Sequence, residues 1–294
     1  MYQGPIRVSA RPGHLIRPRR LRAKISSTAM TRSAIRPIVR ISADETTPVD
    51  DALVVEQPVE FRLSGVPVAV LMRTPGDDES LARGFALSES IVLDPTEFVG
   101  IERAGTTTDD DRWDIVLRPG VQVDPEQFRR NTYTSSSCGV CGKASIDAVR
   151  IAARPLPPGP VLYRRTISEM PQTMRKVQSE FDVTGGIHAA AAFTPDGELV
   201  AVLEDIGRHN AVDKLIGRLA RDHWPLHSFV MMVSGRVSFE IVQKCGVVGV
   251  PMVCAVSAAS SLAAELGEEL GMTVIGFVRD GSFNVYCGAG RVHD

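Results

Sequence analysis

Two cysteines separated by two residues, Cys138 and Cys141, are the sharpest chemical feature of the sequence. This spacing lets both sulfur atoms converge on a zinc ion, form a disulfide or share a sulfur-transfer step. Lys143 follows the pair closely, and a run of Thr and Ser precedes it. An accessible thiol near a cation has a lowered pKa and a more nucleophilic thiolate. The surroundings therefore favour a reactive thiol carried on a loop.

Other interpretations of the pair remain open or are disfavoured. A zinc site needs about four ligands, and a half site completed in three dimensions stays possible. Cys245, Cys254 and Cys287 lie singly in predicted helix or strand, where buried inert thiols are common. A thioredoxin-like dithiol would open a helix directly after a strand. A deaminase zinc site needs His-x-Glu before the pair, whereas His188 follows it. We expect no bound metal.

Three predicted strand-to-helix turns carry polar, small or basic residues. They span residues 204–210, 234–238 and 257–261. In a parallel sheet such turns gather at the carboxyl edge, which is the usual ligand crevice of open α/β folds. The sequence therefore predicts an anionic or nucleotide-like ligand at this edge, with ordinary helix caps as the alternative.

Arginine and histidine side chains in these turns are the candidate ligand contacts. Arg208 and Arg236 offer fork-shaped donors for phosphate, and helix amino termini favour anions. His209 lies beside Arg208 at a helix start. Asp205 could accept a hydrogen bond from a ligand, or cap the helix as Ser234 could. The chain has no Walker A or Gly-x-Gly-x-x-Gly motif, which argues against a standard ATP or NAD site.

Two further segments are of interest. His188 follows a Gly-rich turn, and the residues leave open whether it is structural or binds a ligand. Residues 276–286 predict a strand, a turn and a last strand, with residues 279–282 at the tip. A plain hairpin is the alternative, because Asp-Gly is a common turn pair.

The elements that must position these residues fall into two patterns. Residues 44–125 predict a small strand-rich α+β unit, because apolar and polar residues alternate over 52–73 around a Ser-Gly turn. A helix follows Asp77 or Asp78, and alternation resumes at 113–117.

Strands and helices then alternate, which predicts a mainly parallel sheet covered by helices. The predicted strands are residues 189–194, 199–204, 228–233, 251–256, 272–278 and 283–287. The predicted helices are residues 208–221, 237–246 and 258–269. A helical stripe of Met170, Met174, Val177 and Phe181 precedes them.

The chain accordingly divides into four parts. Residues 1–43 hold nine arginines, Lys24 and no acidic residue, which predicts a basic disordered arm. Met30 could be an alternative translation start. Residues 126–160, rich in small polar residues and then prolines, predict a mobile linker that bears the cysteine pair. Residues 44–125 form the strand-rich part, and 161–294 the α/β cofactor-binding part.

Composition limits the function classes. The 294 residues have a formal net charge of −2, but the part after the arm is strongly acidic. Local arginines, rather than bulk charge, must attract an anionic ligand. No apolar run is long enough to span a membrane. Five cysteines are too few for a disulfide scaffold and suit a reducing cytosol. We expect neither nucleic acid nor a membrane as partner.

Five ordered blocks make the sequence resemble the formate dehydrogenase accessory sulfurtransferase family, FdhD, over about residues 38–290. The blocks are SSCGVCGK, TGGIHAAAAF, EDIGRHNAVDK, SGRVSFEIVQK and GFVRDGSFNVY. The resemblance implies a cytoplasmic homodimer with a cytidine-deaminase-like mixed sheet and helices in its C-terminal domain. It also implies a sulfurtransferase that accepts persulfide sulfur from a cysteine desulfurase. The sulfur then passes to the molybdenum cofactor, bis(molybdopterin guanine dinucleotide), for formate dehydrogenase.

The resemblance also assigns residues. Cys138 matches the persulfide-bearing cysteine, and Cys141 its loop partner. Residues at the tip of the last hairpin match the family's cofactor contacts: Phe277, Val278, Arg279, Asp280, Gly281 and Ser282. Asp280 departs from what an anionic cofactor favours. The turns around Arg208, His209 and Arg236 would hold the guanine dinucleotide arms. A chaperone that binds the cofactor without transferring sulfur is the alternative function.

Overall fold

The computed structural model describes four stretches of the chain, residues 31–104, 111–125, 155–279 and 281–294. The chain divides into two units, and all described residues lie in the second, Thr31–Asp294. Cys138, Cys141 and Asp280 lie outside the described residues.

The first large sheet forms from the predicted strand-rich part. Its strands, in the order β4-β3-β6-β5, are β4 (Val66–Arg73), β3 (Gln57–Leu63), β6 (Arg112–Leu117) and β5 (Phe98–Arg103). A 3-10 turn, Pro95–Glu97, precedes β5. Val59, Phe61 and Leu63 alternate along β3 into the core, as the period of two predicts. The predicted β3–β4 hairpin is confirmed, with antiparallel pairing from Gln57 to Leu63.

A separate antiparallel hairpin precedes this sheet. It consists of β1 (Ser33–Ile41) and β2 (Thr46–Val54). The predicted disordered arm is therefore wrong for residues 33–41. Arg36 and Arg40 lie on one face of the ribbon, and Ile35 and Val39 on the other, because successive side chains alternate. The density of arginine concealed this strand pattern.

The second large sheet contains six strands in the order β13-β12-β11-β10-β8-β9. They are β8 (His188–Phe193), β9 (Leu199–Asp205), β10 (Val230–Val233), β11 (Met252–Ala255), β12 (Thr273–Arg279) and β13 (Ser282–Cys287). The neighbours β10, β11 and β12 are parallel. β8 runs antiparallel to both β10 and β9, and β13 to β12. The sheet is therefore mixed rather than mainly parallel.

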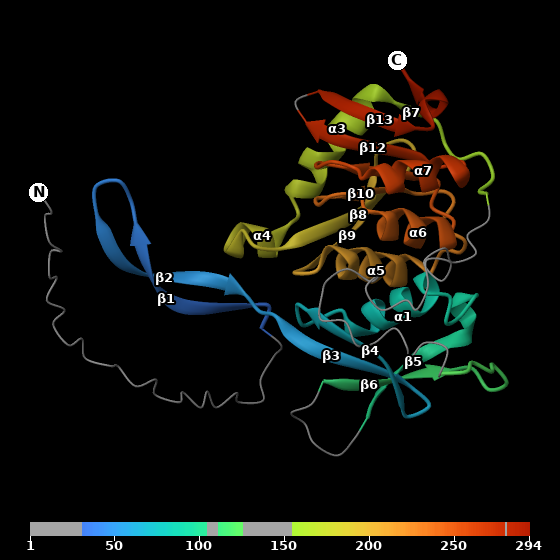
Figure 1. Ribbon diagram of the computed structural model, residues 1–294, viewed down its shortest axis with the longest axis horizontal. Coiled ribbons are helices and arrows are strands. Elements are labelled where there is room, and N and C mark those ends of the chain that lie inside the picture. Colours follow the sequence, from blue (N-terminus) through green and yellow to red (C-terminus); the bar gives the residue numbers. More distant parts are fainter. Residues whose placement is uncertain (1–30, 105–110, 126–154, 280) are drawn as a thin grey trace, which may run out of the picture. The chain divides into compact units, whose positions relative to one another are not determined.

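Helices cover both faces of this sheet. The helices α5 (Arg208–Leu219), α6 (Phe239–Val247) and α7 (Ser261–Glu269) lie side by side along one face (Figure 1). The other face carries α3 (Arg164–Arg175). In β8, Ala190 and Ala192 join the core beneath α5, and Ala189 and Ala191 join the core beneath α3. A strand buried on both sides explains this run of small apolar residues.

The predicted helical stripe before β8 is interrupted. α3 ends at Arg175, and a separate short helix, α4 (Ser179–Thr184), follows. Met170 and Met174 are buried as predicted, but Val177 lies between the helices with half of its surface exposed. Two short pieces complete the described chain: β7 (Leu162–Tyr163) pairs in parallel with β14 (Val292–His293), which follows a 3-10 turn at Ala289–Arg291.

A helix from the first part, α1 (Asp78–Ser88), packs directly against α5. Glycines permit this contact: a Cβ at Gly84 would collide with the carbonyl of Asp213, and one at Gly217 with the carbonyl of Ser80. The apolar core runs without a break from β3 through α1 to α5–α7 and the mixed sheet. The packing fixes the start of α5 relative to the first sheet. The predicted boundary at 126–160 falls mostly outside the described residues, so it stays a prediction.

No helix among the described residues has the length and apolar character needed to cross a bilayer.

Candidate functional site

The three turns singled out in the sequence meet at one edge of the mixed sheet. β9, β10 and β11 run in the same direction, so the turns that lead to α5, α6 and α7 follow their carboxyl ends. The second and third turns are joined: Val237 donates its N–H to Ala258, and Ser260 donates to Val237, each at 3.0 Å. Three helices therefore begin at one edge of the sheet, which confirms the predicted placement of the turns, whereas the ligand stays a prediction.

The end of β12 joins the same edge. Phe277 donates its N–H to the carbonyl of Ser257 at 3.0 Å. The neighbouring Gly276 allows the approach, because a Cβ there would lie 2.8 Å from the Ser257 oxygen. Phe277 itself has φ 54° within a β-bulge. A bulky residue in this region is strained, and such strain concentrates at functional sites.

The predicted hairpin tip is confirmed as a hairpin between β12 and β13. Arg279 pairs with Ser282, whose hydroxyl donates to the Arg279 carbonyl at 3.1 Å. Gly281 has φ 74°, which the turn requires. The side chain of Val278 is buried in the core beneath α3, so this residue can offer a ligand only its backbone. Arg279 is exposed, and its guanidinium lies 5.5 Å from the Phe277 ring centroid.

Arg208 and His209 occupy the first turn of α5. Within the described chain, the Nε of Arg208 is buried and has no hydrogen-bond partner. His209 is almost fully buried, with Nε2 at 3.2 Å from the Ser238 hydroxyl and 3.7 Å from a carboxylate oxygen of Glu240. The Nε of Arg208 thus lacks a protein partner among the described residues, whereas His209 is engaged with α6.

Arg236 lies in the turn between β10 and α6 and is exposed. Its charge reaches His188 at the start of β8, as does the charge of Arg208. Burial and the positive potential of these neighbours lower the pKa of His188. Arg208, Arg236 and His188 therefore share one positive region, although they come from three different elements. The sequence left the role of His188 open, and only the strand pairing places it here.

Asp205 does not face a ligand. It is fully buried at the end of β9, where it pairs with Lys214 at 2.8 Å. Its carboxylate also accepts the N–H of Gly207 at 2.8 Å, the N–H of Thr74 at 3.1 Å and the side-chain amide of Asn210 at 3.0 Å. The interpretation of Asp205 as a ligand acceptor is therefore wrong. The capping alternative does not hold either, because Gly207 is the N-cap residue of α5 and no side chain in the described part of the chain caps this helix.

This buried pair holds the α5 turn to the first sheet. Lys214 donates to the carbonyl of Thr74 at 2.8 Å, and Asn210 donates to the carbonyl of Met72 at 2.7 Å. The hydroxyl of Thr74 accepts the N–H of Ile206 at 3.1 Å. Because Asp205, Lys214 and Thr74 are fully buried, these bonds tie the segment after β4 to the backbone that carries Arg208.

The described residues offer neither a cluster of metal ligands nor, in Cys245 and Cys254, a reactive thiol. Within the part of the chain that the structure describes, no group of three His, Cys, Asp or Glu could hold a metal ion. Burial raises the pKa of Cys254 to about 12 and also raises the pKa of Cys245. Thiols with such high pKa values are poor nucleophiles. The candidate reactive cysteines, Cys138 and Cys141, lie outside the described residues.

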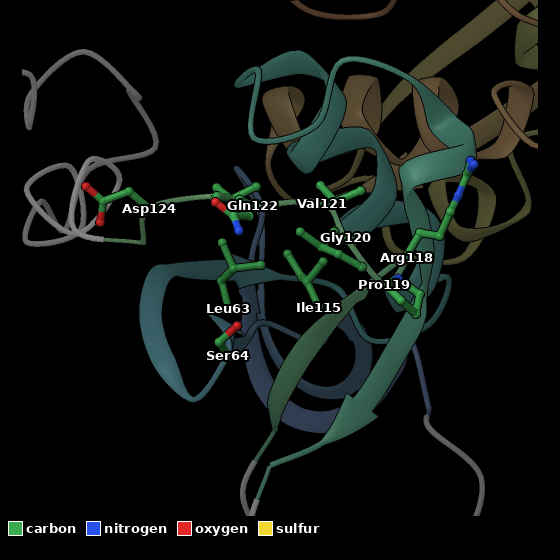
Figure 2. A pocket seen from close by; sticks show the side chains of 11 residues that line it. Leu63, Ser64, Ile115, Arg118, Pro119, Gly120, Val121, Gln122 and Asp124 are labelled. Carbon is green, nitrogen blue, oxygen red and sulfur yellow. The ribbon is translucent and has the colours of Figure 1, made fainter.

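A cavity of about 740 Å³ lies on the first sheet rather than at this edge. Figure 2 shows Leu63 and Ile115 beneath the segment that runs from Arg118 to Asp124. The guanidinium of Arg118 is bound to the carbonyl of Thr96, at 2.6 and 3.0 Å. The cavity is lined by Ser64, Gln122 and Asp124 as well as apolar residues, but its arginine is engaged with the protein. The sheet edge, with two arginines and three helix amino termini, is therefore the better candidate site for an anionic ligand.

A family model and two relatives of known name all point to one protein family. The model of the FdhD/NarQ family matches residues 54–293. A sulfur carrier protein FdhD of Streptomyces coelicolor is 48% identical over 266 residues, which cover 87% of this chain and 94% of the relative. The namesake in Mycobacterium tuberculosis is 43% identical over 271 residues, covering 88% and 98%.

A solved structure shares the fold. The crystal structure of a candidate formate dehydrogenase accessory protein from Desulfotalea psychrophila superposes with a TM-score of 0.70. The match covers 90% of this chain and all of that chain, at 20% sequence identity. At this identity the likeness supports the mixed α/β architecture alone.

Proposed function

The chain belongs to the FdhD/NarQ family, and we propose that it is a sulfurtransferase that carries sulfur to a molybdenum cofactor for formate dehydrogenase. The names of its relatives describe sulfur carriers, and the structural neighbour is described as a formate dehydrogenase accessory protein. The observation that carries the proposal is the cationic edge, where Arg208 and Arg236 stand at turns beside three helix amino termini. That edge suits an anionic dinucleotide.

Sulfur enters on Cys138. The Cys138 thiolate attacks the terminal sulfur of a cysteine desulfurase persulfide, and the desulfurase cysteine leaves as a thiolate. The product is a persulfide on Cys138, and no external oxidant is needed, since one S–S bond forms as another breaks. Cys141 either helps to pass the terminal sulfur on or protects the persulfide. The terminal sulfur then passes to the cofactor, which is the substrate of the transfer.

The dinucleotide arms of the cofactor carry pyrophosphate groups, which need donors in a fixed geometry. Arg208 supplies a fork of N–H groups from the first turn of α5, and Arg236 supplies a second, exposed one. His209 buttresses this turn through Ser238. The part of the chain after residue 43 is acidic overall, so the attraction is local and falls with salt.

The tip of the last hairpin contributes the second half of the proposed cofactor site. Phe277, whose N–H is bound to Ser257, brings the end of β12 next to the turn that starts α7, and the turn at Gly281 follows it. Arg279 adds a guanidinium. Main-chain donors there would offset the unfavourable charge of Asp280.

The proposal also covers the fold type, the cellular location, the oligomeric state and the partners. The mixed six-stranded sheet with helices on both faces supports a deaminase-like layer without deaminase chemistry. The protein acts in the cytoplasm as a homodimer, with a cysteine desulfurase and formate dehydrogenase as partners.

The test is the activation of formate dehydrogenase in cells that lack the native gene for this protein. Wild type restores activity and Cys138→Ala does not, whereas Cys254→Ala, a change at a buried thiol, does. Full activity with Cys138→Ala would remove the sulfurtransferase proposal. It would favour the alternative, a chaperone that binds the cofactor without transferring sulfur.

A further inference from the structure

His188 stands where β8 begins, opposite the end of β9 and beside two of the turns. It pairs with Asp205 in the β8–β9 ladder. Its ring lies against Gly235, whose missing side chain makes room: a Cβ at Gly235 would be 3.4 Å from Nδ1 of His188 and 3.6 Å from Cβ of Arg208. The imidazole is thus enclosed between the β10–α6 turn and the start of α5.

The ring of His188 is half-buried and has no hydrogen-bond partner among the described residues. A half-buried polar group without a protein partner is available to water or to a ligand. The buried Nε of Arg208 is unpaired in the same region. Two polar groups without a protein partner in the described chain, from different elements, therefore lie in the same region of the edge, beside Gly235.

The charged groups that face His188 come from each element packed against it. Arg208 and His209 belong to α5, Arg236 to the turn before α6, and Asp205 to β9. Asp205 is neutralised by Lys214 at 2.8 Å. Burial is the largest cause that lowers the pKa of His188, and the net positive charge around the ring adds to it, so the free protein favours the neutral imidazole.

We propose that His188 binds the pyrophosphate of the dinucleotide ligand and takes up a proton when the ligand arrives. This inference rests on the proposed function, since it concerns the same edge. A dianion beside the ring reverses the local field, so the charged imidazolium becomes the favoured form. His188, Arg208 and Arg236 then form a three-point cationic clamp that exists in full only with the ligand bound.

The sign of the pH dependence follows from linkage. The pKa of His188 is higher in the complex than in the free protein, so the complex binds more protons between these two values. Affinity is highest below the pKa of the free protein and falls as pH rises through the window, by at most about tenfold per pH unit. Above the pKa of the complex, affinity is constant.

Calorimetric titration with GDP-mannose tests the proposal. This ligand is a pyrophosphate diester, so its own charge is constant from about pH 5 to about pH 9. Titrations in two buffers with different ionisation enthalpies give the number of protons taken up. We expect uptake of a fraction of a proton by wild type near pH 7, and weaker binding at higher pH.

Variants assign the uptake. His188→Gln should bind several-fold more weakly at pH 6 and show neither uptake nor pH dependence. His227→Gln, at an exposed histidine before β10, should behave as wild type. In wild type, the NMR signal of the His188 ring should titrate at a higher pH with ligand than without it, which tests the proposal even if the variant fails to fold.

Two results would overturn the inference. If His188→Gln retains the proton uptake and affinity of wild type, His188 is not the residue involved, while the nucleotide site stands. If wild type does not bind GDP-mannose, or if Arg208→Ala and Arg236→Ala bind it as tightly as wild type, the cationic edge is not a nucleotide site. The proposed cofactor site then fails together with this inference, whereas persulfide formation on Cys138 is unaffected.

Discussion

Replacing Asp205 by asparagine should destabilise the protein strongly, although the side chain keeps its shape. In the structure, Asp205 and Lys214 are fully buried and 2.8 Å apart. Asn cannot neutralise the ammonium, so Lys214 must stay charged without a counter-ion or lose its proton inside the core. Burial already lowers the pKa of Lys214. The amide also presents an N–H group where the carboxylate accepts bonds from Thr74, Gly207 and Asn210.

The expected loss is about 3–5 kcal/mol, the usual cost of breaking a buried ion pair by removing one partner. This is a large share of a typical unfolding free energy of about 5–15 kcal/mol. Urea denaturation followed by circular dichroism measures it. Glu265→Gln on the exposed face of α7 is the matched control and should change stability by less than about 0.5 kcal/mol.

The double variant Asp205→Asn/Lys214→Met separates charge from packing. Since it removes the unpaired ammonium, it should recover part of the loss. A cost for Asp205→Asn no larger than that of Glu265→Gln would refute the argument that this pair holds the α5 turn. So would a double variant whose loss equals the sum of the two single losses.

Four further results are expected. Gly84→Ala should lower stability by about 1–3 kcal/mol in urea denaturation, because the new methyl group meets the α5 backbone; an unchanged midpoint would contradict the packing. Lys244→Met should cost about 3–5 kcal/mol by leaving the buried Asp213 carboxylate without its cation, and adding Asp213→Asn should recover part of it; no recovery would contradict the pairing. The folded pKa of His188 is lowered, so the unfolded chain binds more protons between that value and about 6.5, and stability should fall as pH decreases through this window; His188→Gln should flatten the urea midpoint against pH, and an unchanged slope would contradict the assignment. Cys254 should resist iodoacetamide at about pH 8 in the folded protein and react after unfolding, since burial raises its pKa to about 12; rapid alkylation of the folded protein would contradict this.

Local sequence patterns predicted much of the fold. Alternation along β3 and β4 and the Ser-Gly turn between them predicted the hairpin, because a period of two buries one face. The turns after β9, β10 and β11 were placed at one edge, since the carboxyl ends of strands that run in the same direction meet there. The cationic edge was predicted for the same reason.

Long-range pairing could not be predicted from these patterns. The run Ala189–Phe193 is apolar on both faces and carries no information on strand direction, so the antiparallel β8 was missed. With β8 placed, His188 comes to the edge. Asp205 resembled a ligand residue because its partner Thr74 is 131 positions away in the sequence. The contact of Gly84 with α5 likewise depends on packing that no local period records.

The central claim is that Cys138 carries sulfur. The direct measurement is the mass of the intact protein after incubation with a cysteine desulfurase and cysteine. The account predicts an adduct of about 32 Da, one sulfur atom, on wild type, which dithiothreitol removes. Cys254→Ala should retain the adduct and Cys138→Ala should lose it. An adduct of equal yield on Cys138→Ala, or none on wild type, would contradict the account.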